Sequence, residues 1–115
     1  MTGGRFITKP REYALVYEQG KSWACELVVM RALPNGLPIS RYGISVSKRI
    51  GKAVVRNRVK RRLREILRVL PLKPGWDIVL IARPAAASAD YPGLKRATEG
   101  LLTRAHIVET ASFAV

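Results

Sequence analysis

The sequence predicts a single-domain α+β fold, an α-β sandwich in which helices pack against one sheet of three or four strands. Three segments show the apolar alternation or short apolar runs typical of strands: 23–33, 41–47 and 76–83. Three others repeat apolar residues at the spacing of amphipathic helices: 8–19, 53–69 and 90–105. The length of 115 residues suits one domain, and no internal repeat or linker divides it.

The two ends of the chain differ from its middle. Residues 1–7 contain Gly3-Gly4 and show no periodicity, so we expect a disordered N-terminus. Residues 106–115 also lack a clear period and are predicted to form a C-terminal tail. The folded domain is therefore expected to span residues 8–105.

The first predicted helix begins at Thr8, which can serve as its N-cap, and runs to about Gln19. Pro10 is tolerated in the first turn because the amides there have no intrahelical partner. The apolar residues recur at i, i+3 and i+4 and form one narrow face: Tyr13, Val16 and Tyr17.

Two strands are predicted next, at 23–33 and 41–47. The sequence Pro34-Asn35-Gly36 between them is a strong turn signal. Because this link is short, we expect the two strands to pair in antiparallel fashion.

The longest predicted helix covers residues 53–69 and is strongly basic. At about 100° per residue its apolar side chains gather on one side of the helix: Val55, Val59, Leu63, Ile66 and Leu67. The opposite side carries polar and cationic residues: Asn57, Arg61, Arg64 and Arg68. The helix is therefore expected to rest on the sheet and to present a row of guanidinium groups to solvent.

The C-terminal third contains one strand and one helix. Residues 76–83 form a nearly continuous apolar run, as expected for a strand covered on both faces. Residues 84–89 are predicted to be a loop, and Asp90 to cap the last helix. The inner face of that helix is expected to contain Leu94, Leu101, Leu102 and Ala105.

The distribution of charge points to a polyanionic partner. Residues 41–68 hold eleven of the 21 Lys and Arg residues and one acid, Glu65. Solvated helix faces usually mix charges, because opposite charges at i,i+4 stabilise a helix by about 0.2–0.5 kcal/mol and like charges repel similarly. Phosphate groups would reverse this repulsion and release condensed counterions. Glu65 is interpreted as an intrahelical partner of Arg61 or Arg68.

Composition excludes several classes of protein. The net charge of +13 matches a nucleic-acid-binding protein. An anionic membrane surface is the rival partner, but no apolar run approaches the length of a transmembrane helix. The start of the chain lacks the apolar core of a signal peptide, so a cytoplasmic location is expected. The single cysteine, Cys25, can form neither an internal disulfide nor a zinc site by itself.

The basic segment resembles the signature of the bacterial ribonuclease P protein subunit. The match is ungapped and reads SVSKRIGKAVVRNRVKRRLREILR, from Ser45 to Arg68. The resemblance extends to YALVY at 13–17 and to DIVLIARP at 77–84, and it covers roughly residues 8–105. The chain departs from the family in carrying tyrosine where phenylalanine is usual, and in its short basic N-terminus.

This resemblance implies an α-β sandwich similar to domain 2 of ribosomal protein S5, with a left-handed β-α-β crossover around the arginine-rich helix. The general rule for such crossovers would predict the opposite hand. It also implies that the protein binds a catalytic RNA, and that the complex removes the 5′ leader from precursor tRNA. The residues expected to bind RNA are Lys48, Arg49, Lys52, Arg56, Asn57, Arg58, Lys60, Arg61, Arg64 and Arg68.

A second surface implied by the resemblance is a cleft between the first helix and the sheet. It is expected to receive the single-stranded leader, with Tyr13 and Tyr17 on its floor. The competing interpretation of these tyrosines is ordinary core packing. Stacking on aromatic rings tolerates any base sequence, as a variable leader requires.

In this family the RNA subunit and its bound Mg²⁺ carry out catalysis, and we expect no catalytic residue, metal-binding motif or small-molecule substrate in the protein. The residues agree, since the chain has one histidine, His106, and no clustered carboxylates. Two alternatives stay open: a ribosomal or other structural RNA-binding protein, and a stand-alone endonuclease.

Overall fold

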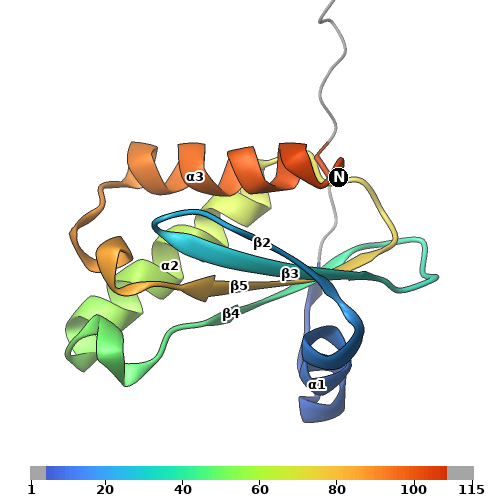
Figure 1. The fold of residues 1–115 in the computed structure, drawn as a ribbon, viewed down its shortest axis with the longest axis horizontal. Helices are drawn as coiled ribbons and strands as arrows, with labels where there is room; N and C mark the ends of the chain where they lie inside the picture. Colours follow the sequence, from blue (N-terminus) through green and yellow to red (C-terminus); the bar gives the residue numbers. More distant parts are fainter. Residues whose placement is uncertain (1–4, 109–115) are drawn as a thin grey trace, which may run out of the picture.

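The structure, a computed structural model, describes residues 5–108 and consists of one sheet with helices on both faces (Figure 1). Its α-helices are α1 (Pro10–Gln19), α2 (Ala53–Val69) and α3 (Tyr91–Arg104). Its strands are β1 (Arg5–Phe6), β2 (Lys21–Ala24), β3 (Val28–Pro34), β4 (Arg41–Ser45) and β5 (Trp76–Ala82). Two short 3-10 helices, η1 (Lys48–Ile50) and η2 (Pro84–Ser88), complete the fold. The predicted α+β class is confirmed, and α2 has the predicted bounds.

The strands are ordered β1-β4-β5-β3-β2. β3 is antiparallel to β2 and to β5, whereas β4 is parallel to β1 and to β5. The predicted pairing of segments 23–33 and 41–47 is therefore wrong, because β5 lies between them. β5 is the most apolar strand, and the central position gives it a partner on each side and cover on both faces.

Segment 23–33, predicted as one strand, is a hairpin of β2 and β3. The chain reverses at residues 25–27, where the Cys25 amide donates to the Val28 carbonyl at 2.9 Å. The reversal contains no Gly, Pro or Asn, so the usual turn signals are missing. Glu26 is the one charged residue of the reversal at 25–27, and it lies exposed at the turn.

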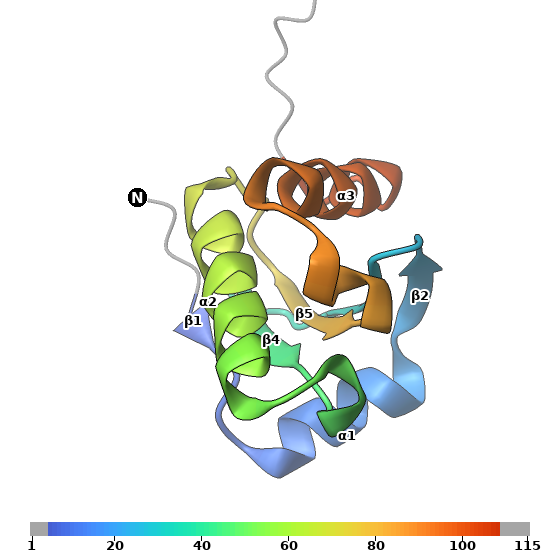
Figure 2. The ribbon, with the colours of Figure 1, turned by 90° about the vertical axis from the view of Figure 1, so that its left-hand side faces the viewer.

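The unit β4-α2-β5 joins two adjacent parallel strands through a helix. In Figure 2, where β4 and β5 point toward the viewer, α2 lies on the same side of the sheet as α3 and opposite α1, and β5 lies to the right of β4. The crossover is therefore left-handed, as the family resemblance implied and against the general rule.

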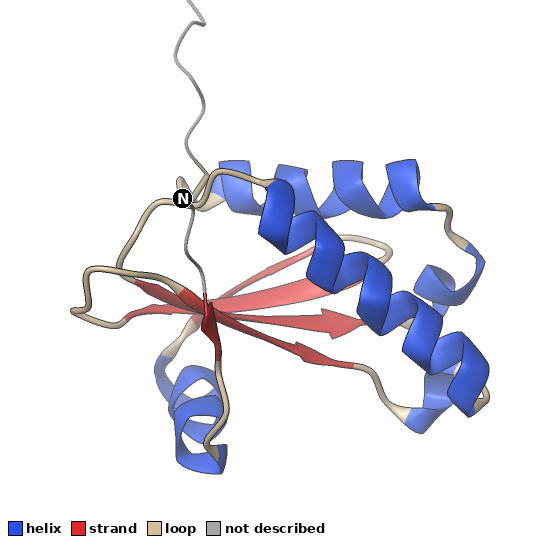
Figure 3. Cartoon of the chain, turned by 180° about the vertical axis from the view of Figure 1, so that it is seen from behind, coloured by secondary structure: helices blue, strands red, loops and turns tan. Residues whose placement is uncertain are grey.

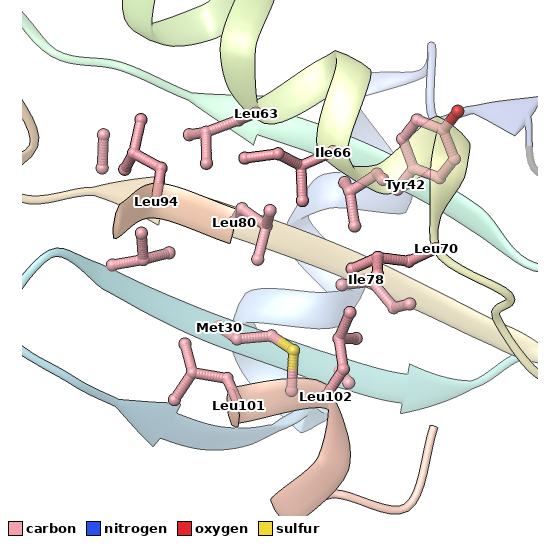
Figure 4. Close-up of a cluster of buried hydrophobic side chains, with 14 of the residues drawn as sticks. Met30, Tyr42, Leu63, Ile66, Leu70, Ile78, Leu80, Leu94, Leu101 and Leu102 are labelled. Carbon is pink, nitrogen blue, oxygen red and sulfur yellow. The ribbon is translucent and has the colours of Figure 1, made fainter. Parts of the chain in front are cut away.

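The main core lies between the sheet and the pair α2 and α3 (Figure 4). Leu63 and Ile66 of α2 and Leu101 and Leu102 of α3 meet strand residues such as Leu80 there, all fully buried. α1 lies alone on the opposite face of the sheet (Figure 3). Among the described residues, three buried side chains form the second cluster on that side: Ile7, Val16 and Val79.

Both predicted ends of the domain need correction. Within the segment 1–7, Arg5 and Phe6 form β1 beside β4, and Ile7 is buried. At the other end, Ile107 and Val108 are buried, and Val108 forms a β-bridge with Leu72. In both places apolar residues without a periodic pattern are ordered by contact with the core. The predictions for residues 1–4 and 109–115 lie outside the described residues.

The helix starts are close to those predicted. The N-cap of α1 is Lys9, one residue after the predicted Thr8. Asp90 caps α3 as predicted, accepting a hydrogen bond of 2.8 Å from the Gly93 amide. The segment 84–89, predicted as a loop, contains the 3-10 helix η2.

Candidate nucleic-acid interface

Helix α2 packs against the core with its apolar side and exposes its polar side to solvent. Val59, Leu63, Ile66 and Leu67 are buried against the sheet and α3. The opposite side carries four exposed residues, which we call the basic ridge: Asn57, Arg61, Arg64 and Arg68. The predicted arrangement of this helix is confirmed. Lys48, Arg49 and Lys52 are also exposed, at or just before the start of α2.

Three further cations of α2 are turned partly inward. Arg58 donates to the Ala87 carbonyl at 3.3 Å, and Arg62 to the Ala89 carbonyl at 2.8 Å. Arg56 donates from Nε to the Gly51 carbonyl at 3.1 Å. These contacts hold η2 and the start of α2 in place. Arg58, which the family resemblance includes among the RNA-binding residues, therefore lies apart from the ridge. Lys60 is half-buried beside the ridge.

Most of the positive charge on the ridge is not balanced by acidic side chains within residues 5–108. Among residues 5–108, the ion pairs join Arg41 to Glu12 and Asp77, and Arg68 to Glu65. Glu65 is therefore an intrahelical partner, as predicted. Arg61 and Arg64 form no ion pair within the described residues, so two neighbouring guanidinium groups on one helix face have no protein counterion.

The two tyrosines of α1 occupy different environments. Tyr13 is half-buried, packs against the small cluster and covers Gly43, where any side chain would collide with its ring. Burial raises the pKa of Tyr13, and the positive charge of Arg64 acts against this rise. Tyr17, one turn later, is 40% exposed. Tyr13 thus packs partly in the core, whereas Tyr17 offers a free aromatic surface.

The N-terminal end of α1 is fastened to the sheet by a polar network that sequence analysis missed. Arg41 in β4 makes two hydrogen bonds to the Asp77 carboxylate of β5, of 2.9 and 2.7 Å, and a third of 2.8 Å to Glu12 of α1. Asn35 also donates to Asp77, at 2.8 Å. Asp77 is 4% exposed, so its charge is neutralised inside the protein.

The C-terminal end of α1 is held by a second arginine. Arg31 in β3 donates to the carbonyl oxygens of Tyr17 at 2.6 Å and Gly20 at 3.2 Å. These carbonyls belong to the helix end, where intrahelical partners run out. Arg31 therefore sets where the last turn of α1, with Tyr17, lies on the sheet. The only signal in the sequence was a charged residue inside an apolar strand.

No metal centre or membrane span is found within the part of the chain that the structure describes. In residues 5–108 no three His, Cys, Asp or Glu side chains are placed to hold an ion. None of the helices there has the length and apolar character needed to cross a bilayer.

Comparisons with known proteins agree with one another. The sequence model of the Ribonuclease P family matches residues 1–106. The ribonuclease P protein component of Dehalococcoides mccartyi is 46% identical over 106 residues, which cover 92% of this chain and 88% of that protein. Two solved structures share the fold at 34% identity each. A mutant of the Staphylococcus aureus RNase P protein has a TM-score of 0.82 and covers 88% of this chain and 87% of its own. The RNase P protein of Thermotoga maritima has a TM-score of 0.77 and covers 87% and 96%.

Proposed function

This chain belongs to the ribonuclease P protein family, and from that premise we propose that it binds the RNA subunit through the basic ridge and the 5′ leader of precursor tRNA beside α1. Membership makes it a protein component of ribonuclease P, the enzyme that processes the 5′ ends of tRNA.

The observation that carries the proposal is the uncompensated ridge on a rigidly packed helix. Arg61 and Arg64 lie exposed without acidic partners in residues 5–108, while the other side of α2 is fully buried. A rigid row of guanidinium groups suits a phosphate backbone, because each phosphate accepts two parallel hydrogen bonds from one arginine. Asn57 can donate to and accept from a nucleotide edge.

The leader-binding part of the proposal is supported by Tyr17. Its exposed ring stands one helical turn from the half-buried Tyr13, on a helix anchored by Arg31 and Arg41. A rigidly positioned aromatic ring can stack on any unpaired base. This property fits a single strand whose sequence varies from one precursor to another.

In this proposal the RNA subunit cleaves the precursor tRNA, and Mg²⁺ is bound mainly by that RNA. The protein contributes binding and positioning of both RNAs. We assign no catalytic residue and no metal ligand to the chain. The partners of the chain are then two nucleic acids, with neither a membrane nor a small molecule among them.

The decisive experiment incubates the full-length protein with precursor tRNA and Mg²⁺, with and without ribonuclease P RNA. We expect cleavage only when the RNA is present, and more of it when the protein is added at limiting Mg²⁺. Cleavage by the protein alone would instead favour the stand-alone nuclease. If the protein has no effect in either reaction, the ribosomal alternative is favoured.

A salt titration tests the ridge itself. If about six cations meet phosphates, log K against log [salt] should have a slope near −4 to −5. Arg61→Ala should flatten this slope by about one unit. Arg62→Ala is the matched control. Arg62 donates to the Ala89 carbonyl and is not part of the ridge, so this variant should leave the slope unchanged. A wild-type slope shallower than about −2 would contradict phosphate binding by the ridge.

A further inference from the structure

Phe6 is a large aromatic side chain exposed beside the basic ridge. It lies in β1, which pairs with β4 at the edge of the sheet next to α2 (Figure 2). The side chain is 43% exposed, whereas the neighbouring Ile7 is buried. A single exposed apolar side chain is common on a protein surface, so the contacts of this ring decide what it can bind.

Two contacts hold the Phe6 ring in place. Its centroid is 4.8 Å from that of Tyr42, and the two ring planes are inclined by 78°, an edge-to-face arrangement. The guanidinium carbon of Arg64 lies over the Phe6 ring, 5.0 Å from its centroid. Tyr42 is buried and fixed in the core, so the ring rests on a rigid base.

This arrangement joins a flat apolar surface to a phosphate-binding group. Bases stack on aromatic rings, and arginine strengthens such sites by its charge and its own planar group. Arg64 belongs to the ridge and has no ion pair within residues 5–108. A nucleotide whose phosphate meets Arg64 would bring its base to the Phe6 ring.

We infer that Phe6 and Arg64 form a stacking platform for an unpaired RNA base at the edge of the basic ridge. The inference rests on the proposed function, since it requires that the ridge binds RNA. It extends the RNA surface from α2 onto β1. It also separates two roles, because the ridge recognises phosphates whereas the platform recognises the flat face of a base.

A structural alternative is that Phe6 merely covers Tyr42. The substitution Phe6→Leu separates the two, because leucine keeps an apolar cover over Tyr42 but removes the aromatic face. Phe6→Trp should restore stacking. Thermal melts of both variants verify that the protein is folded at the temperature of the binding measurement.

The binding test uses two ten-nucleotide RNAs of equal charge and the full-length protein. One RNA has a mixed, non-self-complementary sequence, and the other is its abasic counterpart. We expect Phe6→Leu to weaken binding of the base-bearing RNA by about 5-fold to 150-fold, the range for one lost base stack. Binding of the abasic RNA and the salt slope should not change, because no charge is removed. With 5-iodouridine in the RNA, photocrosslinks should map to Phe6.

Each contrary result has a distinct meaning. Equal binding of the base-bearing RNA by Phe6→Leu and the wild type overturns the platform but leaves the proposed function intact. Equal weakening of both RNAs also overturns it, because Phe6 would then act by placing Arg64 rather than by stacking. If the wild-type protein binds neither RNA, both the platform and the proposed function fall.

Discussion

On one face of the sheet α2 and α3 bury a continuous cluster of 20 residues, whereas on the other face α1 shares a cluster of three. α2 carries the proposed RNA-binding ridge, and α1 carries Tyr17. Apolar packing holds α2 in place. α1 is held by one buried valine, Val16, together with the polar contacts of Arg31 and Arg41.

This difference in how the two helices are held predicts how each surface should respond to mutation and to pH. The ridge of α2 faces away from its core, so RNA binding and folding stability can be altered separately there. On α1 the groups that anchor the helix are charged or polar. Tyr17, the proposed leader-binding residue, is itself held in this way, because its backbone carbonyl accepts a hydrogen bond from Arg31. Stability, pH and leader binding should therefore be more closely coupled on that face.

The largest effect is expected in the main core. Leu63→Ala should lower the free energy of unfolding by about 3–5 kcal/mol, since it removes a fully buried leucine and leaves a cavity. Urea denaturation measures the loss. Arg61→Ala, two residues earlier on the exposed side, should change stability by no more than about 0.5 kcal/mol. Similar losses in the two variants would contradict the division of α2 into a packed side and a free side.

The next effect concerns the polar anchor of α1. Arg41→Met should lower the free energy of unfolding by about 3 kcal/mol, because it leaves the buried Asp77 carboxylate without its cation. Hydrogen exchange should show α1 opening more often than α2. Arg68→Met breaks the exposed pair with Glu65 and serves as the control, with an expected change below about 1 kcal/mol. Comparable losses would mean that the network is not a structural anchor.

A smaller effect is expected in substrate binding. Tyr17→Ala should weaken binding of precursor tRNA to the holoenzyme by about 1–3 kcal/mol and leave mature tRNA unchanged. Tyr17→Phe should be nearly silent, since the aromatic face survives. Tyr13→Ala should also destabilise the fold, because Tyr13 packs in the small cluster. Equal weakening of both tRNAs by Tyr17→Ala would rule out a leader contact.

The smallest effect is a pH dependence from Glu12. Burial raises the pKa of this carboxyl, but amide hydrogen bonds from Lys9 and Thr8 and the charge of Arg41 outweigh it, so the pKa lies below its ordinary value of 4.5. A carboxyl group with a lowered folded pKa stabilises the fold above its ordinary value, and this contribution is lost as the pH falls through the folded value. Wild type should therefore be more stable than Glu12→Gln at pH 7.

The measurement is a pair of thermal melts between pH 7 and pH 3. The difference between wild type and Glu12→Gln should shrink as the pH falls. A difference that stays constant over this range would show that the charge of Glu12 does not stabilise the attachment of α1 to the sheet.

Local patterns in the sequence were enough to predict α2 and α3. The bounds of α2, its buried leucines and its exposed ridge follow from a repeat of three to four residues, which depends only on helix geometry. The Asp90 cap is likewise local, because it joins a side chain to an amide three residues away. The family signature from Ser45 to Arg68 is contiguous and needed no tertiary information.

The tertiary structure alone decided how the strands are ordered and what anchors α1. β5 takes the centre because it competes best for burial. The turn signal at Pro34 gives no information about β5, which follows much later in the chain and inserts between β3 and β4. The pairing of Arg41 with Asp77 depends on the β4–β5 register, which places these two residues opposite each other. Phe6 and Ile7 have no periodic pattern. Phe6 is ordered by β4 and by Arg64 of α2, and Ile7 by its packing with Val16 and Val79. Periodicity is fixed by covalent spacing, whereas strand order and register are fixed by competition among distant segments for the same buried surface.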